Sequence, residues 1–471
     1  AAHDPDVTRG VYELIRGERE LRGTSGSMAG RVFGEAVADG GLPEASELPA
    51  WGGSGRDALG PSACAFGELF VLKLVGRDRP ASEASTEVVR HLSRQRCAAK
   101  SDGDGNGAGF ESSPVAYGEL AYTDEAQGRR VPVALLGGYI PHESSARELV
   151  VDGVNRYVEE LLAQEELSGL GAAPEAVRPL IEADALPSPG TAPVVFERDR
   201  EIAEGFGERL GQLHAALACS DHEDGSFDPE PFGKLTLRAS YQSMRNTAIP
   251  ALRALSEALP TLGPGSREAG RELLEKEGEL LRQLKLVSEA PIDSVRIRCY
   301  GQLELEHVLW TGRDFVFTEF ESDPRRRLAE TRLKHPPLRD VAALLTDMAR
   351  TASLVAREQA QTGTVPASSA LANGTRSWAA YWSAVMSVTL LGGYTRAVRE
   401  SRPDLLPSDP VGVSVLFHAE MLERAAWRLH LSLVRRPGEV GAAIRFLRRL
   451  VDTPPSVEPT ETAPASHPSA G

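Results

Sequence analysis

The sequence is poor in lysine, in cysteine and in long apolar runs, and each shortage excludes a class of protein. Only six of its 52 Lys and Arg residues are Lys, so each Lys stands out against Arg as the default cation. The four Cys residues lie far apart without a Cys-x-x-Cys pair, which excludes a disulfide framework and a thiolate zinc knuckle. No apolar run reaches the roughly 18 residues of a membrane span. We therefore expect a protein of the reducing cytoplasm with no membrane partner.

Charge and length narrow the class further. The formal net charge is −15, which argues against a nucleic-acid partner because such proteins carry a basic face. The first 20 residues lack the layout of a signal peptide. The length of 471 residues allows two or three domains. Composition predicts four segments, namely a small cap or lead-in at 1–59, an α+β lobe at 60–140, a mainly helical region at 141–452 and a disordered Pro/Ser/Thr-rich tail at 453–471.

Hydrophobic periodicity predicts the elements within these segments. Val11, Leu14 and Ile15 indicate a short amphipathic helix. The run FGELFVLKLV at 66–75 predicts one strand buried on both faces. Further strands are expected at 115–122, 130–139, 294–299 and in a hairpin at 308–317, and helices at 81–95, 202–217, 241–259, 266–287, 337–361, 376–400 and 411–434.

Lys73 is the first candidate functional residue, because it interrupts an apolar run. Burying an ammonium group costs several kcal/mol unless the group is paired, and Glu83 or Glu87 on the next helix could pair with it. A strand Lys paired with a helix Glu is the arrangement that binds nucleotide phosphates in protein-kinase-like lobes. The alternative is an edge-strand Lys whose head group lies in water.

The hairpin at 308–317 places a second set of candidates. A turn at Gly312-Arg313 pairs Val308 with Phe317. The same register would place Glu306 opposite Glu319, and Glu304 opposite Glu321. Like charges in facing positions destabilise a sheet, so either the pairing ends at His307 or a cation such as Mg²⁺ lies between the carboxylates.

Other sequence patterns are weaker evidence for a functional site. Residues 102–113 begin like a calcium loop, but Ser113 stands where the bidentate Glu should be, so we interpret them as a polar insertion. No G-x-S-x-G or strand-linked G-x-G-x-x-G motif is present. His214 lies on the apolar side of its helix and is expected to be a core residue. Arg325–Arg327 are expected to form a solvated turn.

Several long strings together resemble the bacterial maltokinases, which are aminoglycoside-phosphotransferase-like kinases often fused to trehalose synthase. The similarity runs from about residue 60 to 452 and is carried by FVLKLV (70–75), EPFGKLTLRASYQSMRN (230–246), DFVFTEFESDPRRRLAETRLKHPPLRDVAALL (314–345), LPSDP (406–410) and LERAAWRLHLSLVRRP (422–437). The resemblance implies a bilobal α+β protein-kinase-like fold, with a small N-terminal cap, a mixed α/β N-lobe and a mainly helical C-lobe. It also implies a reaction in which ATP and maltose give maltose 1-phosphate, within trehalose and α-glucan (glycogen) metabolism.

The resemblance also implies functional positions. Lys73 matches the phosphate-binding Lys of the family and Glu87 its helix partner. The hinge falls near 135–139, so that Leu136 and Tyr139 would contact the nucleotide. The phosphate-cradling segment falls at 60–63 and includes Ser62, but Pro61 there lacks a backbone N–H.

The catalytic motifs of the family are altered in this chain. The family's His-Gly-Asp-x-His-x-x-Gln reads YGQLELEH at 300–307, so Gln302 occupies the position of the base. A neutral amide cannot accept the proton, and general-base catalysis contributes roughly 10²–10⁴ in rate. His307 replaces the magnesium-binding Gln, and Glu319 and Glu321 replace the carboxylates of Asp-Phe-Glu, which would leave His307, Glu319 and Glu321 as metal ligands.

These changes predict a pseudokinase. We expect a catalytically impaired binding or scaffold module beside a trehalose synthase or another α-glucan enzyme, with ATP and Mg²⁺ binding weak or absent. The alternative is an active, atypical sugar kinase in which Glu304 is the base and His307 with Glu319 binds the metal.

Overall fold

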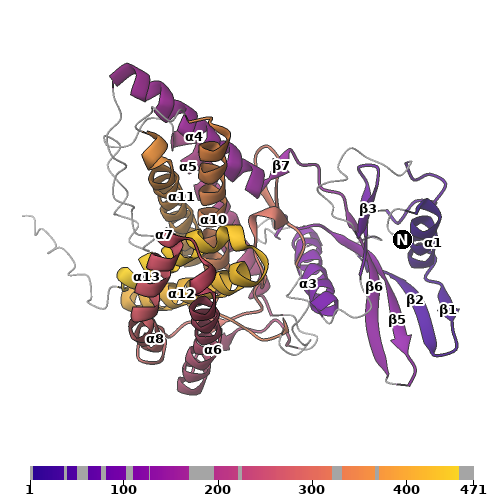
Figure 1. Cartoon of the computed structure of the whole chain (residues 1–471). Coiled ribbons are helices and arrows are strands. Elements are labelled where there is room, and N and C mark those ends of the chain that lie inside the picture. Colours follow the sequence, from indigo (N-terminus) through magenta and orange to yellow (C-terminus); the bar gives the residue numbers. More distant parts are fainter. Residues whose placement is uncertain are drawn as a thin grey trace, which may run out of the picture. The chain divides into compact units, whose positions relative to one another are not determined.

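The computed structural model describes residues 4–34, 36, 40–49, 62–75, 81–101, 110–126, 128–168, 196–220, 225–320, 331–365 and 371–455 (Figure 1). These residues form two compact units. The first comprises the described residues up to 168, together with 196–229 and 297–401. The second comprises 230–296 and the described residues from 402 onward.

A six-stranded antiparallel sheet occupies the N-terminal part of the first unit. Its strand order is β1-β2-β5-β6-β4-β3, with the bounds Glu20–Arg22, Gly26–Val32, Ala116–Asp124, Arg129–Gly138, Phe70–Leu74 and Ala63–Phe66. Helix α1 (Pro5–Arg16) packs Tyr12 and Ile15 on one face of this sheet, and α3 (Ala81–Ser101) is its other helical neighbour. Each strand therefore presents alternate side chains to two different environments.

Two glycines allow α1 to approach the sheet. A Cβ atom on Gly30 would lie 1.9 Å from the carbonyl oxygen of Leu14, and one on Gly118 would lie 2.5 Å from the side chain of Ile15. Residues 20–32, for which the sequence predicted no strand, thus contribute β1 and β2 to the same sheet as the later strands. Their small and polar residues give no hydrophobic alternation to detect.

The single strand predicted for 66–75 is wrong. The chain turns back at Gly67, whose φ of +58° lies in the left-handed region, and β3 and β4 pair as a hairpin with Phe66 opposite Phe70. Leu69 lies in the turn and is half exposed. The apolar run had masked the turn, because only one of its residues is a glycine.

The rest of the first unit is mainly helical. A second sheet, β11-β10-β7, joins Phe315–Phe317, Val308–Trp310 and Ser144–Ser145, and its hairpin pairs Val308 with Phe317, which confirms the predicted register. The helices are α4 (Ala146–Ser168), α5 (Phe196–Leu217), the short η3 (Leu305–His307), α10 (Leu338–Thr362) and α11 (Leu371–Ser401).

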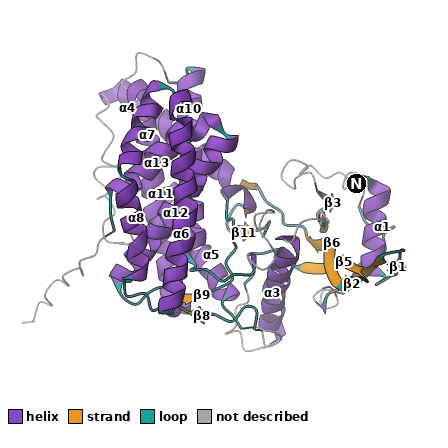
Figure 2. Cartoon of the chain, turned by 60° about the horizontal axis from the view of Figure 1, so that its bottom comes forward, coloured by secondary structure: helices purple, strands orange, loops and turns teal. Residues whose placement is uncertain are grey.

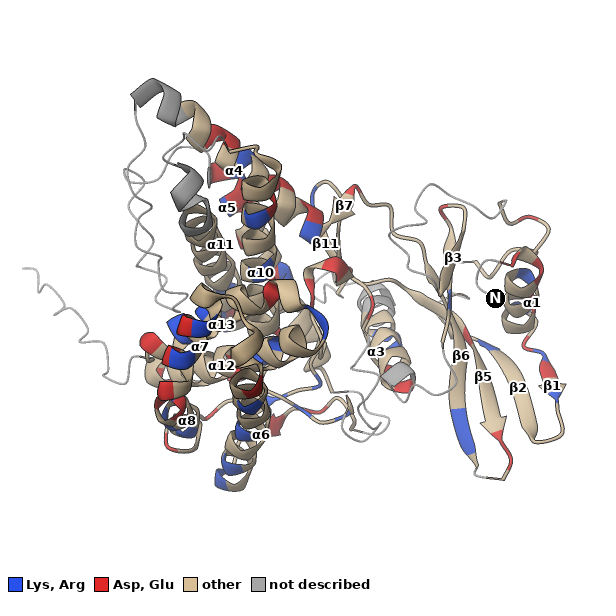
Figure 3. Ribbon diagram, in the orientation of Figure 1, with Lys and Arg blue, Asp and Glu red and all other residues tan. Residues whose placement is uncertain are grey.

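The second unit is built from helices around α12 (Figure 2). It contains β8 (Glu230–Pro231) paired with β9 (Val295–Arg296), α6 (Lys234–Ala258), η1 (Leu259–Thr261), α7 (Pro264–Glu275), α8 (Glu277–Lys285), η2 (Leu286–Ser288), η4 (Pro403–Leu405), α12 (Pro410–Arg435), η5 (Pro437–Glu439) and α13 (Val440–Asp452). The helix predicted for 266–287 is broken at Lys276, and the strand predicted for 294–299 is only two residues long. In Figure 3 the ribbon of α7, α8 and α13 carries both acidic and basic positions. Arg448 of α13 forms an ion pair with Glu272 of α7.

Several predictions fall on residues outside the described ranges. These include residues 60 and 61 of the predicted phosphate-cradling segment, residues 102–109 of the polar insertion, Glu321, the turn at Arg325–Arg327 and the tail from 456 onward. Within the part of the chain that is described, no helix combines the length and the apolar character that crossing a bilayer requires.

Candidate functional site

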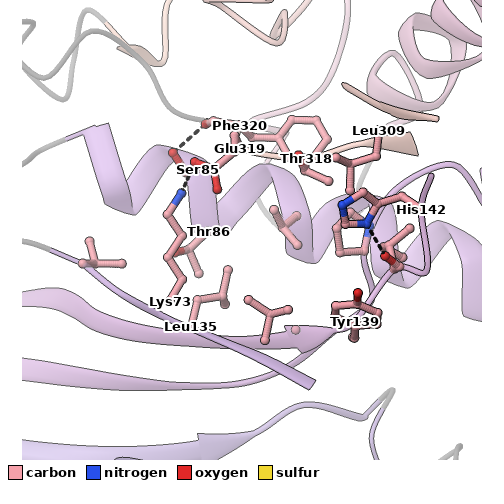
Figure 4. Close-up of a pocket in the computed structure, with 17 residues that line it drawn as sticks. Lys73, Ser85, Thr86, Leu135, Tyr139, His142, Leu309, Thr318, Glu319 and Phe320 are labelled. Atoms are coloured by element: carbon pink, nitrogen blue, oxygen red, sulfur yellow. Dashed lines mark hydrogen bonds and ion pairs between the residues drawn. The ribbon is translucent and has the colours of Figure 1, made fainter. Parts of the chain in front are cut away.

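One pocket of the first unit is bounded by β4, β6, α3, the segment after β6 and residues 318–320 (Figure 4). Its walls are mainly apolar, and its polar groups gather in two places. One set contains Lys73, Ser85 and Glu319, and the other contains Tyr139 and His142. The lining residues are Val71, Lys73, Val75, Ser85, Thr86, Val89, Pro114, Leu135, Gly137, Gly138, Tyr139, Ile140, His142, Leu309, Thr318, Glu319 and Phe320.

Lys73 forms an ion pair with Glu319 at the charged end of the pocket. The Lys73 side chain is 19% exposed, so the pairing offsets the desolvation of its ammonium group. Glu319 has a φ of 53°, an uncommon conformation for a residue other than glycine. Beside the pair, the Ser85 hydroxyl donates a 2.5 Å hydrogen bond to the Phe320 carbonyl, which fixes α3 to this segment.

The predicted pairing of Lys73 with a carboxylate of α3 is wrong. Glu87 instead accepts a 2.7 Å bond from Arg298 and bonds Arg332, which also reaches Glu83 at 2.7 Å. The hydrogen bond to Glu87 raises the pKa of Arg332. Arg298 is 3% exposed and needs a counter-charge more than a strand Lys at a pocket wall does. Position on the helix alone could not show this competition.

The opposite end of the pocket follows β6. The backbone N–H groups of Gly138 and Tyr139 donate to Val115 and Leu69, so they are used within the lobe. The carbonyl oxygen of Ile140 lies 2.8 Å from Nδ1 of His142. Tyr139, predicted as a nucleotide contact, does line the pocket.

Leu136, also predicted as a nucleotide contact, does not line the pocket. Leu136 is fully buried in the core on the α1 side, together with Tyr12 and Leu72, whereas its neighbour Leu135 lines the pocket. Successive residues of a strand face opposite sides, so an error of one position moves a side chain to the other face. Ser62 is exposed, and its carbonyl accepts a 2.7 Å bond from the backbone of Leu74.

Residues 300–305, which the resemblance aligns with the catalytic motif of the family, are anchored from α10. Asp340, which is fully buried, accepts bonds from the backbone N–H groups of Tyr300 at 2.6 Å and Gly301 at 3.0 Å. Asp347 is also buried and lies seven residues further along α10. It accepts a 3.0 Å bond from the N–H of Leu305. Two carboxylates of one helix therefore hold both ends of residues 300–305.

The prediction that His214 is a core residue is confirmed, because its side chain is buried and both ring nitrogens have hydrogen-bond partners. Its Nε2 lies 3.3 Å from Asp340 and its Nδ1 lies 3.0 Å from the hydroxyl of Tyr394. The sequence analysis did not identify Asp340 or Asp347. Their separation of seven residues, two turns on one face of a helix, is the signal that could have linked them.

Gln302, Glu304 and His307 lie on this anchored loop, and none of the three lines the pocket. Nδ1 of His307 lies 3.2 Å from the carbonyl of Gln302. The sheet pairing stops at Val308, and Glu306 forms an ion pair with Arg147 at 2.6 Å. The ladder therefore ends before Glu306 and Glu319 could pair across it, and each of these carboxylates has its own cationic partner.

Of the three predicted metal ligands, only His307 and Glu319 lie within the described residues. Among the described residues, no group of three His, Cys, Asp or Glu side chains could bind a metal ion. Glu319 is engaged by Lys73, and His307 offers a nitrogen donor, whereas Mg²⁺ prefers oxygen ligands. Glu321 is outside the described ranges, so the predicted set of three is not assembled here.

In the second unit, α12 carries two arginines beside an aromatic ring. The guanidinium groups of Arg424 and Arg428 lie 4.1 Å and 5.4 Å from the ring centre of Trp427. Glu423 is buried and accepts a 3.0 Å bond from the hydroxyl of Thr247 on α6. This carboxylate connects α12 to α6.

Known structures share this fold. The chain is similar to a structure described as glucosamine kinase in complex with glucosamine, ADP and inorganic phosphate, with a TM-score of 0.58, 16% identity and coverage of 96% of this chain and 84% of that chain. Glucosamine kinase in crystal form B gives a TM-score of 0.55 and 15% identity over 95% of this chain and 99% of that chain. No family model matches the sequence.

These similarities confirm the predicted fold class. The chain has an α+β, bilobal, kinase-like fold, with a sheet-containing N-lobe and a mainly helical C-lobe. At this level of identity, the similarity defines the fold, and the chemistry has to be argued from the residues.

Proposed function

We propose that this chain is a sugar-kinase-like protein that binds a nucleotide but is impaired in phosphoryl transfer, and that it acts as a pseudokinase binding or scaffold module. The nucleotide would lie in the pocket between β4, β6 and α3. A cationic group at one end and apolar walls along its length suit a phosphate group attached to a flat base.

The observation that carries the proposal is Gln302 on an anchored loop. Asp340 and Asp347 hold residues 300–305 in place, which supports a defined position for Gln302. By the resemblance to maltokinases, the base belongs at position 302, where this chain has an amide. The amide can orient a hydroxyl group, but it cannot take its proton.

The substrate and partner follow from the resemblance alone. The family reaction transfers a phosphoryl group from ATP to maltose, so the ancestral acceptor would be a maltose-like sugar. A cytoplasmic partner of this chain would be a trehalose synthase or another α-glucan enzyme. The arginines around Trp427 support the loss of the family's sugar chemistry, because the family has acidic and tyrosine side chains on this helix.

Restoring the base tests the proposal. ADP release would be measured with ATP and maltose, glucose or glucosamine for the natural chain, for Gln302→Asp and for the control Gln302→Asn, which is isosteric with Asp but carries no base. We expect almost no turnover in the natural chain and a gain of about 100-fold or more in Gln302→Asp, since general-base catalysis is worth that much. Rapid turnover by the natural chain would contradict the proposal.

Glu304→Gln separates the proposal from the alternative of a relocated base. Glu304 is on the same anchored loop, two residues from Gln302. If the natural chain is active and Glu304→Gln loses that activity, the protein is an atypical sugar kinase. If the natural chain is inactive and still binds ATP, it is a pseudokinase.

A further inference from the structure

The two ends of the pocket differ in chemistry. Lys73 and Glu319 form a charged end, whereas Tyr139, Ile140 and His142 form an uncharged end (Figure 4). A phosphate group of a nucleotide is attracted to the ammonium group of Lys73. Its base is then directed along the apolar walls towards His142.

The hydrogen bond of His142 fixes the roles of its two ring nitrogens. Nδ1 lies 2.8 Å from the carbonyl oxygen of Ile140, and a carbonyl oxygen can only accept. Nδ1 therefore carries the proton in the neutral ring, and Nε2 is left as a hydrogen-bond acceptor. Within the described part of the chain, Nε2 has no hydrogen-bond partner of its own.

The Ile140 carbonyl accepts a hydrogen bond from the ring. Nε2 of His142 therefore offers a side-chain acceptor at the uncharged end of the pocket. A ligand that satisfies Nε2 must present an N–H donor on the edge of its ring. A purine with an amino group at C6 does so, whereas a purine with hydrogen at C6 does not.

We propose that Nε2 of His142 accepts a hydrogen bond from the exocyclic amine of a bound adenine nucleotide, which makes His142 a specificity-determining residue. This inference rests on the proposed nucleotide binding. It adds a residue that the sequence analysis did not identify, because a histidine after a strand has no distinctive spacing.

Titration calorimetry with ATP and with purine riboside 5′-triphosphate, which lacks the 6-amino group, tests the proposal. We expect the natural chain to prefer ATP about fivefold to tenfold, the value of one net hydrogen bond. His142→Ala should lose that preference while its affinity for purine riboside triphosphate stays nearly the same.

His142→Asn covers the case in which His142→Ala disturbs the loop. Its amide can still donate to Ile140, but it lacks an acceptor at the position of Nε2. His430→Ala is the matched control, because His430 is exposed on α12. Its preference for ATP should equal that of the natural chain.

The outcomes separate this inference from the function on which it rests. The role of Nε2 would be overturned if His142→Ala and His142→Asn lost affinity for ATP and for purine riboside triphosphate equally. It would also be overturned if both variants kept the preference for ATP. Either result would leave nucleotide binding in place. Failure of the natural chain to bind either ligand would overturn both.

Discussion

Asp340 accepts a 2.6 Å hydrogen bond from the backbone nitrogen of Tyr300, and both residues are buried. The second oxygen of the same carboxylate accepts a 3.0 Å bond from the N–H of Gly301. His214 adds a third contact at 3.3 Å. One side chain therefore connects α10, α5 and the loop that carries Gln302, and the shape of that loop depends on it.

Replacing this carboxylate should destabilise the whole protein. We expect Asp340→Ala to lower the free energy of unfolding by about 3 kcal/mol, because it leaves buried N–H donors without an acceptor. Urea denaturation measures the change. Glu204→Gln removes a surface ion pair with Arg396 and should cost less than about 1 kcal/mol. Equal effects of the two substitutions would show that Asp340 does not anchor the loop.

The contact between α5 and α11 depends on two glycines. A Cβ atom on Gly207 would lie 2.0 Å from the carbonyl oxygen of Leu390, and one on Gly393 would lie 2.2 Å from that of Glu204. Gly207→Ala and Gly393→Ala should each lower the thermal midpoint, with a cost of roughly 1–3 kcal/mol from overpacking.

The neighbouring glycines of the same helices are matched controls. Gly205 and Gly392 have no atom within 4 Å of an added Cβ. Gly205→Ala and Gly392→Ala should leave stability unchanged or raise it by about 0.5–1 kcal/mol, since Ala favours the helix. A loss of stability in these controls equal to that at Gly207 and Gly393 would contradict the close-contact explanation.

The sequence was sufficient where local patterns determine structure. The hairpin at 308–317 was predicted with its register, because bulky apolar residues alternate around one turn and only one register brings them together. The long helices α5, α6, α10, α11 and α12 were predicted from their apolar spacing, whereas α4 was not. His214 was correctly placed in the core for the same reason.

The sequence was insufficient where the partner comes from a distant segment. Lys73 offered two nearby carboxylates on α3, but its ion pair is with Glu319, and Glu87 is taken by Arg298 and Arg332. Competition between cations depends on burial, which periodicity does not show. The position of Leu136 on the core face was missed for a different reason, because neighbouring residues of a strand point to opposite sides of the sheet.

The ion pair between Lys73 and Glu319 should limit nucleotide binding. The carboxylate of Glu319 competes with a phosphate group for the ammonium and repels it. We expect Glu319→Gln to bind ATP severalfold more tightly in the presence of EDTA, and Lys73→Met to bind it at least tenfold more weakly. Glu306→Gln, whose carboxylate pairs with Arg147, should bind as the natural chain does. Weaker metal-free binding by Glu319→Gln would contradict this competition.

Buried His418 should make the second unit sensitive to acid. Burial lowers the pKa of His418 from 6.5 to about 4, and its Nε2 lies 2.8 Å from the side-chain oxygen of Gln283. Because the folded state disfavours the charged ring, stability is complete above pH 6.5 and falls as the pH drops towards 4. His418→Asn should therefore lose less stability between pH 7 and pH 4.5 than the natural chain, by an amount of order 1–3 kcal/mol in urea denaturation at each pH. His430→Asn, on the exposed side of the same helix, should keep the acid response of the natural chain. An identical pH dependence in His418→Asn and the natural chain would show that this ring does not titrate across the transition.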